Sequence, residues 1–145
     1  MSNSYRDAVR RVNCLTNATD ALYHQVARKF GVADSVMITA YMLHEKGDGC
    51  LLYDVYSESG VTKQTINSAI RKLERDGYIY LTRDSGKAKR IWLTDTGKEF
   101  IANTAARLYE AECRAFQPWT DEEFEMYFRL IEKYNEAFRA EVEKL

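Results

Sequence analysis

One stretch, residues 61–97, constrains the fold more than any other part of the chain: VTKQTINSAIRKLERDGYIYLTRDSGKAKRIWLTDTG. Within residues 62–76, apolar residues recur at the i, i+3, i+4, i+7 spacing of a helix that buries one stripe. These apolar residues are Ile66, Ala69, Ile70 and Leu73. Thr62 is suited to cap the first turn, and Gly77 is suited to end the helix in a left-handed conformation. The pattern predicts an amphipathic helix.

The opposite side of this predicted helix carries polar and cationic side chains of the kinds that contact nucleic acid. At about 100° per residue, a set of polar residues falls opposite the apolar stripe, and we call it the outer face. It consists of Gln64, Ser68, Arg71 and Arg75, flanked by Asn67 and Lys72. Guanidinium forks, carboxamides and hydroxyls can bridge phosphate oxygens and read base edges.

Shorter elements on both sides complete a winged motif. Residues 52–59 predict a short helix, and Gly60-Val61 the turn into the next one. After the helix, residues 78–82 and 89–94 predict two strands, and residues 83–88, with a glycine and basic flanks, predict the turn between them. Each signal alone would also fit an unrelated small α+β domain. Their order, together with the outer face, favours nucleic-acid binding.

The segments VTKQTINSAIRKLERDGYI and KRIWLTDTGKEF resemble the winged helix-turn-helix of the multiple-antibiotic-resistance regulator (MarR) family. The resemblance is most specific over residues 73–79 and 93–97, and it extends more loosely, through the layout of helices, over nearly the whole chain. Two features depart from the family pattern. The wing carries Asp84, Lys87, Lys89 and Arg90 in place of a frequent acidic-and-arginine repeat, and Tyr56 stands where a small residue is expected.

We therefore predict a mainly α fold with a small β-hairpin wing, in which a winged helix-turn-helix domain is joined to a helical dimerisation region. The single MarR-like domain would span residues 1–145. Its DNA-binding part would cover 34–94, and its dimerisation part 5–30 and 95–145.

Outside the motif, the chain predicts helices. Residues 5–30 have the periodicity of a long amphipathic helix, which Gly31 would end, and a second helix would begin at a cap, Asp34 or Ser35, and run to about residue 45. Residues 50–51 predict a short third strand. One helix would start at Thr94 or Thr96, the latter through a Thr96-x-x-Glu99 capping box, and run until residues 117–119 stop it at a proline.

The last helix would begin with a capping box at Thr120 and carry an apolar seam whose spacing alternates between four and three. We predict that this seam pairs with the first helix and with the same helices of a second subunit; an intramolecular bundle is the alternative. The predicted dimerisation residues are Val9, Val12, Phe124, Phe128, Ile131, Asn135, Phe138 and Val142.

Charge and cysteine content restrict the kind of partner and the cellular compartment that we expect for this chain. Residues 61–98 hold nine Lys or Arg and four acids, a net charge of +5, whereas the whole chain carries −1, so the remaining residues carry −6. Such sorting is expected of one DNA-facing surface on an acidic protein. Residues 1–11 lack the apolar core of a signal peptide, no run is long enough to span a bilayer, and the three cysteines are scattered. We expect a reduced, cytoplasmic protein with no membrane partner.

No pattern for catalysis, a metal or a cofactor is present. The two histidines, His24 and His44, are far apart, and no phosphate-binding glycine loop or located triad is found. Cys14 is a candidate redox residue, because some members of the resembled family sense peroxide through a cysteine in the first helix; a small buried hydrophobe is the alternative. The resemblance also implies an aromatic pocket for a small aromatic effector; ordinary core packing of the same residues is the alternative. Its residues would be Tyr23, Tyr41, His44, Tyr109 and Trp119.

The predicted function is a homodimeric DNA-binding transcription regulator, acting as a repressor on a pseudo-palindromic site and relieved by a small effector. Its helix 62–76 would enter the major groove, and its wing would reach the backbone or the minor groove. The predicted DNA-binding residues are Thr62, Lys63, Gln64, Thr65, Asn67, Ser68, Arg71, Lys72, Arg75, Lys87, Lys89 and Arg90. A winged-helix module for protein or RNA, a small-molecule binder without DNA function and a cysteine-based redox regulator are the alternatives.

Overall fold

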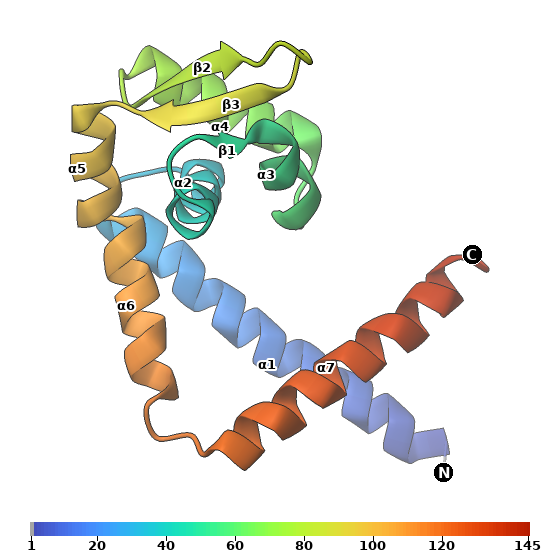
Figure 1. Ribbon diagram of the computed structural model, residues 1–145. Coiled ribbons are helices and arrows are strands. Elements are labelled where there is room, and N and C mark those ends of the chain that lie inside the picture. Colours follow the sequence, from blue (N-terminus) through green and yellow to red (C-terminus); the bar gives the residue numbers. More distant parts are fainter. Residues whose placement is uncertain (1) are drawn as a thin grey trace. The chain divides into compact units, whose positions relative to one another are not determined.

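A computed structural model describes the backbone of residues 2–145 and the side chains from Ser4 onward (Figure 1). The chain divides into two compact units, an N-terminal unit that ends at Tyr109 and a C-terminal unit from Glu110 to Leu145. Both consist mainly of helices, and the N-terminal unit also contains a small antiparallel sheet. The predicted fold class, mainly α with a β-hairpin wing, is confirmed.

The N-terminal unit begins with two helices separated by a glycine turn. Helix α1 spans Ser2–Lys29, and α2 spans Asp34–Lys46. Gly31 has a φ of +68°, the left-handed conformation predicted for the break between them. The predicted cap of α2 was wrong. Ala33 occupies the N-cap position, so neither Asp34 nor Ser35 caps this helix, and Asp34 instead accepts a 2.7 Å hydrogen bond from His24.

The helix-turn-helix follows as predicted. Helix α3 covers Leu52–Glu58 and α4 covers Lys63–Arg75, and the turn between them contains Gly60 at a φ of +72°. All four predicted apolar residues of α4 are buried against the core of the unit. They are Ile66, Ala69, Ile70 and Leu73. Because this stripe is anchored on α2, the opposite side of α4 is held toward solvent.

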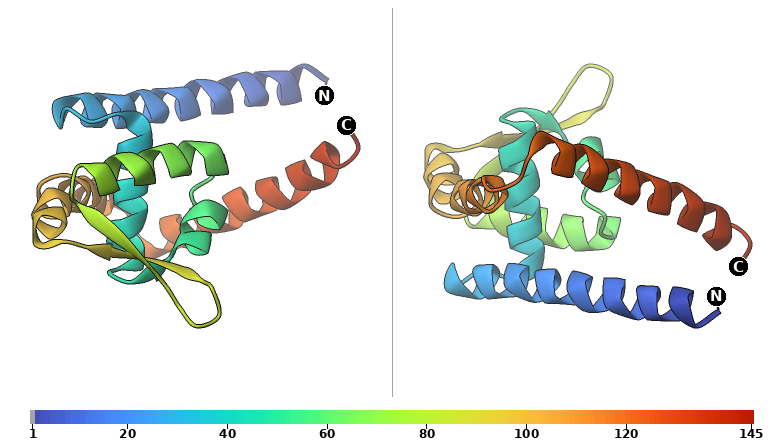
Figure 2. Two further views of the ribbon diagram at one scale, coloured as in Figure 1. Left: turned by 90° about the horizontal axis from the view of Figure 1, so that it is seen from above. Right: turned by 90° about the horizontal axis from the view of Figure 1, so that it is seen from below.

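Three strands form the sheet in the order β1-β3-β2, all antiparallel. Strand β1 is Cys50–Leu51, β2 is Ile79–Arg83 and β3 is Lys89–Leu93. We call the β2–β3 hairpin the wing. Figure 1 shows the wing and α4 at the same end of this unit, and both views in Figure 2 show the tip of the wing projecting away from α2, α3 and α4.

The predicted helix from residue 94 or 96 to residue 116 is two helices. Helix α5 spans Asp95–Asn103 and α6 spans Ala105–Phe116, and between them Thr104 adopts φ −125° and ψ −88°. Thr104 is 5% exposed, and its hydroxyl donates to the Phe100 carbonyl at 2.7 Å. Thr94 is the N-cap, with its Oγ1 accepting from the Gly97 amide at 3.0 Å, so the predicted Thr96 capping box was wrong.

The C-terminal unit contains the end of α6 and helix α7, Asp121–Val142. The predicted capping box is confirmed: Thr120 Oγ1 accepts from the Glu123 amide, and the Glu123 carboxylate accepts from the Thr120 amide. Phe116, Trp119 and Phe124 form an aromatic cluster with ring centroids 5.0–5.5 Å apart. Among the helices described here, none is long and apolar enough to cross a membrane.

Candidate nucleic-acid interface

The outer face of α4 is a continuous exposed surface. Gln64, Ser68, Arg71 and Arg75 are all exposed, at successive turns of the helix, and Lys72 is exposed beside them. These side chains extend along the whole length of α4. A single binding partner that lies along the helix can therefore contact all of them at once. The arrangement presents two guanidinium groups, a carboxamide and a hydroxyl on one side of a helix that is fixed by its other side.

Several predicted DNA-binding residues are also engaged within the chain. Thr62 caps α4, because its Oγ1 accepts from the Thr65 amide at 3.2 Å and lies 2.8 Å from the Thr65 hydroxyl. The Lys72 ammonium donates to Asp76 at 2.9 Å, one turn farther along. Such an exposed pair contributes little to stability, so Lys72 remains free to exchange this partner for a phosphate.

Asn67 is held by a residue of the preceding helix. The Tyr56 hydroxyl on α3 donates a hydrogen bond to Asn67 Oδ1, and both side chains are half-buried. The Lys63 ammonium lies 5.0 Å from the centre of the Tyr56 ring, within the range of a cation–π contact. Burial raises the pKa of Tyr56, while the Asn67 hydrogen bond and the charge of Arg71 act in the opposite direction.

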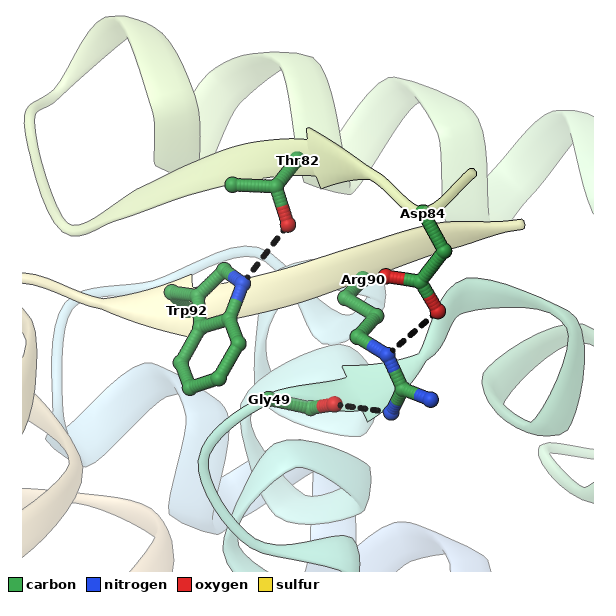
Figure 3. Close-up of polar contacts among 5 residues, drawn as sticks. All are labelled: Gly49, Thr82, Asp84, Arg90 and Trp92. Carbon is green, nitrogen blue, oxygen red and sulfur yellow. Dashed lines mark hydrogen bonds and ion pairs between the residues drawn. The ribbon is translucent and has the colours of Figure 1, made fainter. Parts of the chain in front are cut away.

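Polar contacts hold the wing in place (Figure 3). Arg90 donates from Nε to the Asp84 carboxylate at 2.8 Å and from Nη1 to the Gly49 carbonyl at 2.9 Å. Across the hairpin, the Trp92 indole donates to the Thr82 hydroxyl at 2.8 Å. Gly49 packs under Trp92, and a Cβ there would lie 2.7 Å from the ring. Arg90, a predicted DNA contact, thus ties the wing to the loop before β1.

The tip of the wing presents exposed cations. Lys87 and Lys89 are exposed, and Lys87 adopts a φ of +69°, a conformation that residues other than glycine rarely take. The turn closes through the Lys87 amide, which donates to the Asp84 carbonyl at 2.8 Å, and the Asp84 amide, which donates to the Ala88 carbonyl at 2.9 Å. The point charges of these lysines stand on a hairpin with defined geometry.

Two residues of this surface were missed as site residues by the sequence interpretation. Arg83 is exposed and is paired with Lys89 in the register of the hairpin, which adds a third cation near the tip. The basic flank of the predicted turn was the signal that could have identified it. Tyr56 was recognised only as an unusually large residue, and nothing in the sequence indicated its contact with Asn67.

The predicted dimerisation residues lie on exposed helix faces. In α1, Val9 is 57% and Val12 51% exposed, and every residue from Ser4 to Gln25 is exposed. In α7, Phe124 is half-buried in the aromatic cluster, and the rest of the seam is exposed. Those exposed residues are Phe128, Ile131, Asn135, Phe138 and Val142. Each face is apolar and uncovered within its own unit.

The remaining candidate sites are only partly assembled. In the predicted aromatic pocket, Tyr109 packs against Tyr41 at 6.1 Å and against His44 at 5.2 Å between ring centroids, whereas Trp119 belongs to the aromatic cluster of the C-terminal unit. Tyr23 is 43% exposed on α1. Cys14 is exposed on α1, and burial raises the pKa of the half-buried Cys50 thiol. No cluster of potential metal ligands occurs in the part of the chain that the structure describes.

Comparison with known proteins identifies the fold. No protein-family model matches the chain. YcgE of Bacillus subtilis, an uncharacterized HTH-type transcriptional regulator, is 23% identical over 127 residues, which are 86% of this chain and 82% of that protein. The MarR-family transcription regulator SP03579 superposes with a TM-score of 0.73 at 16% identity, over 99% of this chain and 96% of that one.

Two further structures agree with this comparison. The MepR–DNA complex of Staphylococcus aureus gives a TM-score of 0.70 at 21% identity, covering 88% of this chain and 93% of MepR. The transcriptional regulator SlyA gives 0.67 at 19% identity, covering 93% and 96%. The resemblance to MarR-family regulators that the sequence predicted is therefore confirmed at the level of the fold.

Proposed function

We propose that this chain, which has the winged-helix fold of the MarR-family regulators, is a transcription regulator that binds a specific site in double-stranded DNA as a homodimer. The observation that carries the proposal is the outer face of α4, whose polar and cationic side chains are exposed while the opposite stripe is buried. A helix with this division can enter the major groove, where each base pair presents a distinct pattern of donors and acceptors.

Within this proposal, the residues of α4 divide into two groups. Gln64, Asn67, Ser68 and Arg71 contact base edges from the first two and a half turns of the helix. Thr62, Lys63, Thr65, Lys72 and Arg75 lie toward its ends or flanks and contact phosphates. The MepR structure, solved in complex with DNA, supports this use of the fold.

The wing supplies the second contact to the duplex. Lys87 and Lys89 are exposed near its tip, and Arg83 is paired with Lys89 on the neighbouring strand. These cations reach the phosphate backbone or an adjacent minor groove, where narrow A·T tracts attract positive charge. Arg90 contributes mainly by holding the wing in place through Asp84 and Gly49.

Dimerisation is supported by the exposed apolar faces of α1 and α7. The α7 seam repeats with the 3.5-residue average spacing of a helix–helix interface, and it carries one amide, Asn135, of the kind that fixes register. A second subunit with twofold symmetry would cover these faces and place two copies of α4 on a pseudo-palindromic site.

The regulation we propose is repression relieved by a small aromatic effector. The cluster of Tyr41, His44 and Tyr109 in the N-terminal unit supports an effector that stacks against rings. Binding that favours one of two arrangements of the dimer would change the distance between the two α4 helices and thereby the affinity for DNA.

Two alanine variants test the assignment of roles. Arg71→Ala should lower affinity for the specific site by about 1–3 kcal/mol and relax base preference at one position in each half-site. Lys87→Ala should weaken binding to specific and scrambled duplexes equally, and it should reduce the salt dependence by about one unit for each phosphate that the variant no longer touches. Fluorescence anisotropy over a salt series measures both effects.

The two duplexes in this experiment are a site recovered by selection from random DNA and its scrambled counterpart. Equal loss of affinity for both duplexes in Arg71→Ala would show that this residue anchors the helix and does not read a base. If neither variant altered binding to DNA, the winged-helix assignment of function would be wrong, and an RNA or protein partner would take its place.

A further inference from the structure

Tyr56 makes two contacts with the outer side of α4, although it belongs to α3. Its hydroxyl donates to Asn67 Oδ1, and its ring lies 5.0 Å from the Lys63 ammonium. Lys63, Asn67 and Arg71 are spaced at i, i+4 and i+8, so they lie along one stripe of α4. Tyr56 therefore lies beside a row of side chains that the proposed function assigns to DNA.

The Tyr56 hydroxyl faces the oxygen of the Asn67 carboxamide, so the hydroxyl is the donor in this hydrogen bond. A tyrosine hydroxyl carries its proton at neutral pH and can donate it to a hydrogen bond, and burial, which raises the pKa of Tyr56, acts in the same direction. The Asn67 oxygen accepts this hydrogen bond, which leaves the two N–H groups of the Asn67 amide as the donors of the carboxamide that face away from Tyr56. Because oxygen and nitrogen are fixed relative to each other, holding one sets the direction of the other.

This arrangement alters what Asn67 can recognise. An unconstrained asparagine commonly binds adenine with both ends, since its oxygen accepts from N6 and its nitrogen donates to N7. The oxygen can accept a second hydrogen bond, but its direction is fixed toward Tyr56 on α3, and the nitrogen at the other end of the carboxamide is the group turned toward the base. Two donors suit an edge that presents acceptors, such as O6 and N7 of guanine or O4 of thymine.

We propose that Tyr56 is a positioning residue that sets the base preference of Asn67, directing its amide donors to an acceptor edge in place of the paired donor and acceptor of adenine. This inference rests on the proposed function, since it assumes that α4 reads duplex DNA. It adds a residue on α3 that determines specificity without contacting the base.

Substitution by phenylalanine isolates the hydroxyl. Tyr56→Phe keeps the ring beneath Lys63 and removes only the donor to Asn67. Tyr53→Phe makes the same change one turn earlier on α3, at a residue that is 73% exposed, and it serves as the matched control. Thermal unfolding followed by circular dichroism verifies that each variant is folded before its binding is compared.

The readout is base preference, measured on the full chain by anisotropy. The probes are duplexes that carry the selected site with each of the four base pairs placed in turn at every position of both half-sites. We expect Tyr56→Phe to change the relative affinities at one position per half-site. The affinity for adenine at that position, relative to the preferred base, should rise about two- to tenfold, which is the contribution of one hydrogen bond. Tyr53→Phe should keep the wild-type profile.

A double-mutant cycle assigns the effect to Asn67. Asn67→Ala should lose preference at the same position, and Tyr56→Phe should then add no further change at that position. An unchanged profile in Tyr56→Phe, or a change that persists in the Asn67→Ala background, would overturn the inference while leaving the proposed function intact. A wild-type chain that prefers no duplex over scrambled DNA would instead overturn the proposed function, and this inference with it.

Discussion

Gly97 lies where the start of α5 meets the residues that follow α4. The Thr94 amide donates to the Tyr78 carbonyl at 3.0 Å, and the Thr94 hydroxyl donates to the Gly77 carbonyl at 2.6 Å. A Cβ on Gly97 would lie 1.8 Å from the Tyr78 oxygen, a distance that no side chain can accept. The absence of a side chain at one residue thus allows α5 to pack against the chain beside α4.

Substitution at Gly97 should therefore destabilise the fold. We expect Gly97→Ala to lower the free energy of unfolding by at least about 1–3 kcal/mol, the usual cost of forcing atoms into a packed site. Gly86→Ala is the matched control, because a Cβ at Gly86 would have no heavy atom within 4 Å. Urea unfolding compares the two variants. A Gly97→Ala protein as stable as the Gly86→Ala control would contradict the packing described here.

Among the helices that the structure describes, α7 is the one whose apolar residues most clearly lack a packing partner. Its capping box fixes where it begins, yet its apolar residues apart from the half-buried Phe124 are exposed, including Ile131 at 40% and Phe138 at 53%. A helix of this kind gains its stability from packing, since the backbone alone contributes little. The proposed dimer supplies that packing.

A charge placed in the seam should break the dimer. We expect Ile131→Glu to raise the dimer dissociation constant by about 30-fold or more, because losing a central interface residue costs at least about 2 kcal/mol. Lys133→Glu introduces the same side chain on the opposite side of α7 and should leave the dimer intact. Light scattering over a range of concentrations measures both. A wild-type chain that is monomeric at micromolar concentration would rule out the proposed dimer.

The elements predicted well from the sequence were those whose signals are local. The stripe of α4, the Thr120 capping box and the turn glycines Gly31 and Gly77 depend on neighbouring residues, and the structure agrees with each. The break at Thr104 was missed. Its hydroxyl bonds within α5 and its side chain is buried, and that burial depends on packing that spacing along the chain does not reveal.

The same distinction applies to the candidate site. Exposure of the outer face followed from the helical period, because burying one stripe leaves the other in solvent. The contacts of Arg90 with Gly49, and of Tyr56 with Asn67, join residues from different elements. A predicted DNA-binding arginine therefore proved to hold the wing, and a tyrosine outside the predicted site proved to hold one of its residues.

For the whole molecule, the distribution of charge and the proposed twofold symmetry together predict the form of the DNA target. The net charge of +5 over residues 61–98 stands against −6 over the rest, which favours approach of DNA to one region of each subunit. Two subunits related by a twofold axis present that region twice. We therefore expect the joint target of the proposed dimer to be an inverted repeat whose half-sites lie about one helical turn, roughly 10 bp, apart.

Selection from a random duplex library, followed by sequencing of the bound fraction, tests the central claim most directly. The full wild-type chain is used at near-physiological salt, and the Arg71→Ala variant is selected in parallel. We expect the wild type to enrich an inverted repeat with half-sites about 10 bp apart. In the selection with Arg71→Ala, one position per half-site should lose its preference. Enrichment of no sequence above the input library by the folded wild-type protein would contradict the claim that this chain is a sequence-specific regulator.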